Sequence, residues 1–410
     1  MVSQIVKNAF RAIFLLLILS VGCNKPSREV FNSQGRATNQ VIESELLVQL
    51  HKSSPAPQLQ KDATNEFCMN AEAIRLGRRI FFDDAFSSNG AVSCASCHDP
   101  RLGFTTRDAT ARGLALTFRN APSILNVSHY RWFSWDGSSD VLWAQSLKPF
   151  EHPLEFGTSR REVLRQFQSD HYIQMYESAF GNQPPVLDCH DDLLNEFFAN
   201  VGKSLAAFQS TLNSGESRFD QFVAKLDSSP KNFAGSDQSI LSESEIRGMR
   251  LFFGKANCVF CHNGPLFTDM EFHSVRVPPR SLTDPLDSGR FDGVDILLDA
   301  EYGSWTVHSA QFNSTTRPRV KKSGQLWGQF KTPSLRDVTR TAPYMHNGVF
   351  ATIEEVVEHY STFAKAVEVG HHEETILKPL NLTHMEKSDL VAFLGALESV
   401  DYCGDGLTID

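Results

Sequence analysis

The sequence lacks an excess of positive charge and, past its N-terminal part, any long apolar run. Its 39 lysines and arginines are outnumbered by 48 aspartates and glutamates, so the formal net charge is −9. Because phosphate binding needs clustered cations, this balance argues against a nucleic-acid partner. No later apolar run is long enough to cross a bilayer. Strand-like alternation is also scarce, which argues against an all-β fold.

The N-terminal part is typical of an exported protein. Lys7 and Arg11 precede a short apolar run, which predicts a secretory signal over residues 1–23 and a periplasmic location. The run ends in Ser-Val-Gly-Cys23, which resembles a relaxed lipobox and would anchor the chain to a membrane through lipid on Cys23. The alternative is an ordinary cleaved signal that contains a cysteine. Residues 24–65 are rich in Ser, Asn, Gln and Lys, which predicts a flexible tether.

The remaining chain is long enough for two cores, and it repeats one unit. A segment of the type Gly-x-Arg-[Ile/Leu]-Phe-Phe precedes each of two Cys-x-x-Cys-His motifs, and Phe-Thr follows each motif. The flanking segments are 76–82 and 103–105 for the first motif, and 247–253 and 266–268 for the second. This duplication predicts two domains, over residues 66–230 and 231–403.

The periodicity favours a mainly α-helical fold with few strands and long ordered loops. Apolar residues at three- and four-residue steps predict one long amphipathic helix over 194–212. Residues 278–330 carry Pro, Gly and Asp without periodicity and predict a long ordered loop. Capping boxes predict three helix starts, at Ser242/Glu245, Thr352/Glu355 and Thr383/Glu386.

The two Cys-x-x-Cys-His motifs carry the strongest chemical signal. They consist of Cys94, Cys97 and His98, and of Cys258, Cys261 and His262. Covalent haem c needs two thiols for the vinyl groups and an adjacent histidine for the iron. A thioredoxin-like pair needs no such histidine, and a zinc ribbon spaces its cysteine pairs about 15–20 residues apart. The sequence therefore predicts two covalently bound haems. Among the other cysteines, Cys68, Cys189 and Cys403 allow one disulfide in three pairings, which stay open.

Four further segments resemble those of bacterial di-haem cytochrome c peroxidases, a family that includes the methylamine-utilisation enzyme MauG. The segments are Arg119–Pro122, Trp135–Gly137, Gln145–Pro149 and Thr341–Gly348. The resemblance covers about residues 70–400. It implies two cytochrome c-like haem domains packed against each other, so that the haems face a shared interface.

For the first haem, the resemblance implies an open iron where peroxide binds. Glu155 stands at the position of a pocket glutamate that moves a proton, and Gln145 at that of a hydrogen-bonding neighbour. The apolar neighbours of Glu155 predict a raised pKa. Where reductively activated members carry a blocking histidine, this chain has Arg112. His129 is the one nearby alternative ligand, and we expect it to pack.

For the second haem, the resemblance implies that Tyr360 is the axial ligand. The helix that begins after Thr352 places Tyr360 on its buried face. The peroxidase branch has methionine at this position and the MauG branch has tyrosine, which is a known haem ligand. One alternative is that Tyr360 only packs in the core. The alternative ligands are His359, which is a weaker candidate, and then Met345 or Met249, which are weaker still.

Two further roles follow from the resemblance alone. Trp135 matches the tryptophan that carries charge between the haems, whereas the other tryptophans are expected to pack. Asn120, Thr341 and Pro343 match the ligands of a Ca²⁺ ion, for which oxygen donors are suitable.

Three functions compete at this point. The first is a peroxidase that reduces hydrogen peroxide with electrons from a small cytochrome c or cupredoxin. The second is a MauG-like enzyme that oxidises a side chain of a partner protein, which Arg112 and Tyr360 favour. The third is an electron carrier without catalysis, in which both irons are six-coordinate.

Overall fold

The computed structural model describes residues 44–57, 61–228, 240–312, 318–367, 377–404 and 407. The predicted signal and Cys23 lie outside these residues, as does most of the predicted tether. The chain divides into a unit over 1–40 and a unit over 41–410, and every described residue belongs to the second unit. Across these described ranges, no helix has both the length and the apolar character needed to span a membrane.

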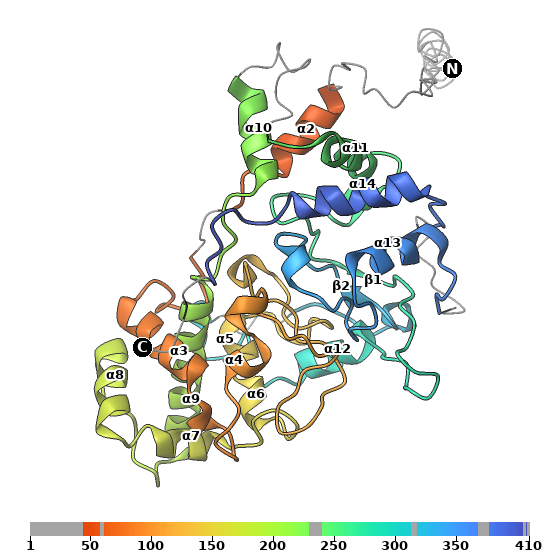
Figure 1. The fold of residues 1–410 in the computed structure, drawn as a ribbon. Coiled ribbons are helices and arrows are strands. Elements are labelled where there is room, and N and C mark those ends of the chain that lie inside the picture. Colours follow the sequence, from red (N-terminus) through yellow and green to blue (C-terminus); the bar gives the residue numbers. More distant parts are fainter. Residues whose placement is uncertain are drawn as a thin grey trace, which may run out of the picture. The chain divides into compact units, whose positions relative to one another are not determined.

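The described chain consists of helices joined by long loops (Figure 1). The helices are α2 Ser44–Lys52, α3 Ala71–Phe82, α4 Cys94–Cys97, α5 Leu142–Gln145, α6 Lys148–Glu151, α7 Arg160–Gln166, α8 Asp170–Phe180, α9 Asp191–Gln209, α10 Arg218–Ser228, α11 Glu243–Phe253, α12 Arg290–Leu298, α13 Ile353–Thr362 and α14 His384–Gly395. Within the described residues, the strands are β1 Phe272–His273 and β2 Phe330–Lys331, which pair antiparallel. The predicted mainly α-helical fold with few strands is confirmed.

Local capping signals in the sequence locate three of these helices. All three capping boxes form, and α11, α13 and α14 begin directly after Ser242, Thr352 and Thr383. Helix α9 is buried on nearly all sides in its second half, instead of along one face as predicted.

The expectation of one long loop over 278–330 is wrong, because α12 interrupts it. The buried face of α12 includes Arg290 and Gly293, while the apolar Ile296 is half exposed. An apolar periodicity therefore could not reveal this helix.

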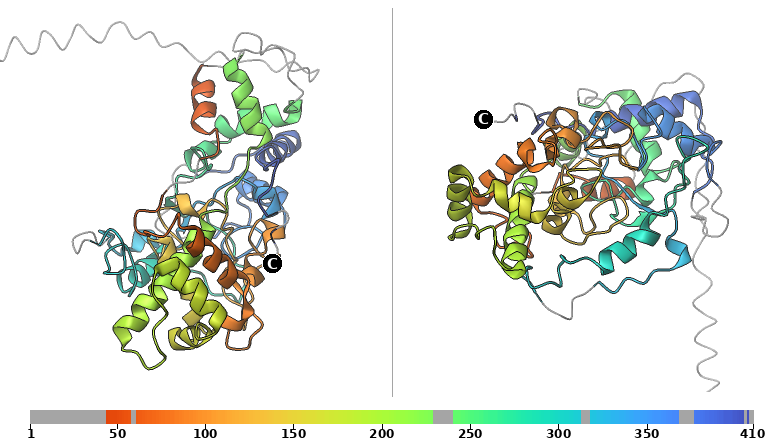
Figure 2. Two further views of the ribbon diagram at one scale, coloured as in Figure 1. Left: turned by 90° about the vertical axis from the view of Figure 1, so that its left-hand side faces the viewer. Right: turned by 90° about the horizontal axis from the view of Figure 1, so that it is seen from below.

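The buried side chains form two hydrophobic clusters. The first surrounds α9 and includes residues of α3, α5, α7 and α8. The second includes residues of α10, α11, α13 and α14. Figures 1 and 2 show α3 beside α9, and α11 beside α14. Leu50 of α2 is fully buried in the second cluster, so part of the stretch predicted as a tether is folded. The domain boundaries themselves remain a prediction.

The sequence repeat is also a structural repeat. An added Cβ atom on Gly77 of α3 would collide with the backbone of Ser204 in α9, and one on Gly248 of α11 would collide with that of Asp389 in α14. Each haem motif is thus preceded by a helix whose glycine permits a close crossing. After the motifs, the Thr105 hydroxyl donates to Ala121 O and the Thr268 hydroxyl donates to Thr332 O.

The two repeats bind each other through equivalent backbone groups. The amide of Asn120 donates to His346 O (2.7 Å), and the amide of Lys331 donates to Trp135 O (2.8 Å). In each bond, an amide from one repeat (Asn120 or Lys331) donates to a carbonyl of the other repeat (His346 or Trp135). This exchange brings the two haem motifs to one shared cavity.

Candidate haem sites and the cavity that joins them

Each Cys-x-x-Cys-His motif presents its histidine in the same way. His98 Nδ1 lies 3.0 Å from the carbonyl oxygen of Phe104, and His262 Nδ1 lies 3.0 Å from that of Phe267. An Nδ1–H that donates to a carbonyl oxygen leaves the Nε2 lone pair for a metal. Burial lowers the pKa of both imidazoles, which favours the neutral form that ligates iron.

The cysteines of the motifs are placed for covalent attachment, and three of them are held in the thiol form by burial. Burial raises the pKa of the Cys94 and Cys258 thiols to about 12 and that of Cys97 to about 11. Zinc sites and reactive thiol pairs need thiolates near neutral pH. Thioether bonds to a porphyrin require instead that the sulfur atoms border its cavity, and the four motif cysteines do so.

One cavity of about 1290 Å³ contains both motifs. Ordinary small-molecule pockets measure about 300–1,000 Å³, so this space suits larger groups. Its wall includes residues that the sequence analysis selected for catalysis and ligation, namely Trp135, Gln145, Glu155 and Tyr360. The fold therefore brings these residues together with His98 and His262.

Two polar groups in this wall suit a cavity that holds haem. Gln145 Oε1 is buried and has no hydrogen-bond partner in the described part of the chain. Lys331 is 8% exposed and lies 4.1 Å from the ring centre of Tyr130, with no ion pair to any described carboxylate. Burial lowers the pKa of Lys331 to about 8. Haem propionates are carboxylates and would supply the missing counter-charge.

Glu155 faces the cavity close to the first motif. Its carboxylate is near enough to Cys94 and Cys97 to raise the pKa of both thiols, and its Oε1 lies 3.5 Å from His152 Nδ1. Burial raises the pKa of Glu155, and the charge of His152 opposes that shift. The predicted direction of the pKa is confirmed. Gly113 supports this position, because a Cβ atom there would collide with the backbone of Glu155.

Neither Arg112, which replaces the family's blocking histidine, nor His129, the one alternative ligand, lines the cavity. Arg112 is largely exposed and lies 3.6 Å from Asp108, and it is absent from the cavity wall. His129 Nε2 lies 3.2 Å from Asn213 Oδ1, so His129 has the structural role expected of it. Among the described histidines, His152 is the cavity residue that lies beside Glu155.

Tyr360 is the member of its helix that faces the second motif. It lines the cavity, and the Cys258 and Cys261 sulfur atoms add to the burial that raises the pKa of its hydroxyl. His359 instead points its Nε2 at Val275 O, at 2.9 Å. Met249 is fully buried in the second hydrophobic cluster, away from the cavity. Met345 lines the cavity and thus remains an alternative by position alone.

Trp135 lies in the wall of the cavity that both motifs line. Its indole N–H donates to Asn120 O (2.9 Å), and its own carbonyl accepts from Lys331. Asn120, Thr341 and Pro343, the expected calcium ligands, line the same cavity. Calcium binding stays a prediction.

The sequence analysis missed one charged pair at the second motif. Asp269, His273 and Cys261 form the one close group of potential metal-binding side chains among the described residues. His273 Nε2 lies 2.8 Å from Asp269 Oδ2, and this bond raises the pKa of His273 to about 11. Because Cys261 belongs to the haem motif, we assign this group to the surroundings of the second haem and not to a separate metal.

Comparisons with known proteins show which family this chain resembles. The sequence profile of the di-haem cytochrome c peroxidases matches residues 71–228. A cytochrome-c peroxidase, IdrP1, from Pseudomonas sp. (strain SCT) is 33% identical over 340 residues, which cover 80% of this chain and 81% of that protein. The chain belongs to the di-haem cytochrome c peroxidase family.

Other members of the family are similar over the same span. The methylamine utilization protein MauG from Methylorubrum extorquens is 31% identical over 335 residues, or 81% of this chain and 79% of that one. The crystal structure of a MauG-like protein associated with microbial copper homeostasis superposes with a TM-score of 0.63 at 28% identity, over 85% and 94% of the two chains. Membership implies two c-type haems, which the paired motifs and the cavity fit.

Proposed function

We propose that this di-haem protein reduces hydrogen peroxide at the first haem site, with electrons relayed through the second. The observation that supports it best is the asymmetry of the cavity. Glu155 lies near Cys94 and Cys97 of the first motif, whereas Tyr360 lies near Cys258 and Cys261 of the second. Gln145 lines the same cavity. When bound, each haem supplies an iron that accepts or passes electrons, and an open iron also binds peroxide.

The chain's own residues then handle protons and position. Glu155, with its raised pKa and its neighbour His152, shifts a proton from one peroxide oxygen to the leaving oxygen. Gln145 Oε1 accepts a hydrogen bond from the peroxide or from an ordered water. Two electrons and two protons convert one peroxide into two waters, and Trp135 carries charge between the two haem sites.

A MauG-like oxidation of a partner protein is the second candidate, and Arg112 and Tyr360 favour it. The exposed Arg112 leaves the first site without a blocking histidine in the resting protein. A tyrosine ligand stabilises the ferric and higher oxidation states of iron, whereas methionine favours ferrous iron. A carrier in which both irons are six-coordinate is the third candidate. Export through the N-terminal signal, a lipid on Cys23 and a Ca²⁺ ion at Asn120, Thr341 and Pro343 belong to the same proposal.

Steady-state turnover separates these functions. The haem-loaded protein should consume hydrogen peroxide with reduced cytochrome c as electron donor. Rapid reaction with peroxide but negligible turnover with cytochrome c or a cupredoxin would favour the MauG-like candidate. An unchanged absorption spectrum after peroxide addition would leave only the carrier.

A further inference from the structure

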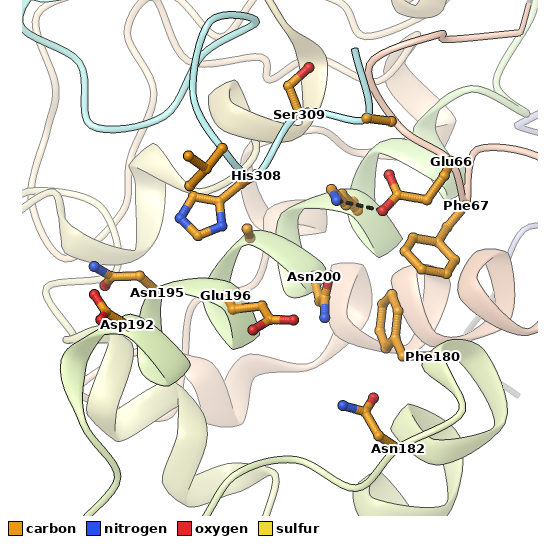
Figure 3. Close-up of a pocket in the computed structure, with 14 residues that line it drawn as sticks. Glu66, Phe67, Phe180, Asn182, Asp192, Asn195, Glu196, Asn200, His308 and Ser309 are labelled. Carbon is orange, nitrogen blue, oxygen red and sulfur yellow. Dashed lines mark hydrogen bonds and ion pairs between the residues drawn. The ribbon is translucent and has the colours of Figure 1, made fainter. Parts of the chain in front are cut away.

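A second pocket, of about 530 Å³, opens over helix α9 and shares no lining residue with the haem cavity (Figure 3). One side is formed by α9 itself, through Asp192 and Glu196. Figure 3 shows His308 reaching over α9 from the loop after α12, with Glu66, Phe67 and Phe180 across from it. The pocket therefore joins three segments that are far apart in the sequence.

The lining favours a positively charged aromatic molecule. Lys203 is buried and bound to Glu66 at 2.9 Å, so these two charges compensate each other. Asp192 and Glu196 form no ion pair with a described residue, which leaves an excess of negative charge in the lining. Phe67 and Phe180 pack edge to face with ring centres 4.7 Å apart, and such a pair offers a wall for a further ring.

A continuous series of rings leads from this pocket into the first hydrophobic cluster. The imidazole of His308 lies 5.4 Å from the ring centre of Tyr302, and Tyr302 lies 5.9 Å from Trp143. The Tyr302 hydroxyl also donates to the backbone oxygen of Asn195 (3.3 Å), a residue of the pocket wall. Tyr302 is thus linked to the pocket at two points.

The other end of the series lies beside the first haem site. Trp143 belongs to α5, and Leu142 and Gln145 of the same short helix line the haem cavity. Since a helix with side chains is about 10–12 Å across, Trp143 is separated from that cavity by one helix. The Trp143 indole N–H is buried and has no partner in the described chain. An oxidised Trp143 has no neighbour to take its proton, so the oxidising equivalent moves on to Tyr302.

We infer that Trp143 and Tyr302 conduct oxidising equivalents from the first haem site to this pocket, where a cationic aromatic reductant is oxidised. The inference rests on the proposed peroxide reduction. Each peroxide takes two electrons, one from each of two reductant molecules. Every reductant loses one electron and one proton, and the two protons enter the two waters formed from peroxide. As Tyr302 loses an electron, its phenolic proton is released to solvent, and a proton from the reductant restores the hydroxyl in the next step. In the resting protein this hydroxyl accepts a hydrogen bond from Arg160 and donates one to Asn195 O.

The test compares two catechols of opposite charge with the haem-loaded full chain. Dopamine carries an ammonium group and 3,4-dihydroxyphenylacetate carries a carboxylate on the same ring system. With peroxide present, dopamine should be oxidised faster by about tenfold or more. Calorimetry on the resting protein should show that Glu196→Gln weakens dopamine binding, which tests the pocket without turnover.

The route is tested with Tyr302→Phe and with Tyr172→Phe as its control. Tyr172 is buried in the same cluster, at 6% exposure against 9% for Tyr302, but it bonds Asp83 away from the series. Tyr302→Phe should lower dopamine oxidation by about tenfold or more and leave cytochrome c oxidation intact, while Tyr172→Phe changes neither. A nitrone spin trap, located by peptide mass spectrometry, should label Tyr302 after peroxide addition, and Trp143→Phe should abolish that label.

Two results would overturn the inference. One is a Tyr302→Phe variant that oxidises dopamine at the wild-type rate, and the other is a wild-type protein in which no spin-trap adduct forms on Tyr302. In both cases cytochrome c turnover can persist, so the proposed peroxidase function survives. If the wild type reduces peroxide with neither donor, the proposed function fails and this route fails with it.

Discussion

At the scale of single residues, the cavity assigns different work to Glu155 and Tyr360. The carboxyl of Glu155 lies in the cavity wall beside the exposed His152, whereas the hydroxyl of Tyr360 lies near the sulfur atoms of the second motif. The motifs and their histidines were predictable from the sequence because all three groups lie within five positions. The burial of Lys331 without an ion pair was not predictable from the sequence, because it depends on a fold that brings β2 against Tyr130.

Glu155→Gln should lower the rate of peroxide consumption by about 10²–10⁴-fold, the usual contribution of one proton-transfer group. Peroxide should still reach the iron, because glutamine has a similar size. The wild-type rate should fall with decreasing pH through the raised pKa of Glu155, since protonation removes the base. Stopped-flow absorbance with His152→Gln as the neighbouring control measures both effects. An undiminished rate in Glu155→Gln would remove Glu155 from the mechanism.

Tyr360→Met should raise the reduction potential of the second haem, since methionine favours ferrous iron. Axial ligands set haem reduction potentials over a range of about 0.8 V, and the expected shift is a fraction of that range. Tyr344→Phe is the control, because Tyr344 lines the same cavity and donates its hydroxyl to Val338 O. Spectroelectrochemical titration measures the potentials. An unchanged potential in Tyr360→Met, with a shift in His359→Ala, would reassign the ligand.

At the scale of elements, short-range signals located helices and long-range packing did not. Capping boxes fixed the starts of α11, α13 and α14, because a cap is complete within four residues. Helix α12 escaped notice because its buried face is formed partly by Arg290, whose guanidinium lies 4.6 Å from the Trp132 ring centre. The series from Trp143 to Tyr302 escaped notice because its members are distant in the sequence. A buried tryptophan also has an ordinary packing role.

Gly248→Ala should destabilise the second half of the protein by about 1–3 kcal/mol, because the new methyl group overpacks the crossing of α11 and α14. Gly395→Ala is the matched control within α14. A Cβ atom there meets no atom within 4 Å, and alanine should add up to about 1 kcal/mol of stability. Urea unfolding of the haem-loaded variants measures the difference. Equal stability of the two variants would contradict the close crossing.

At the scale of the whole molecule, duplication explains the arrangement and divergence explains the function. The two repeats share helix crossings, turn geometry and histidine hydrogen bonds, and they bind each other through equivalent backbone groups. They differ in the groups near their cysteines, where the first motif has Glu155 and the second has Tyr360. On the proposed function, a single duplicated unit yields one site for a small oxidant and one site for storing charge.

The electron paramagnetic resonance spectrum of the resting, fully haem-loaded protein tests this asymmetry most directly. Because Arg112 stands where related enzymes carry a blocking histidine, the ferric protein should show one high-spin and one low-spin haem. Two low-spin signals in the wild type would contradict the account, because neither iron would be open to peroxide.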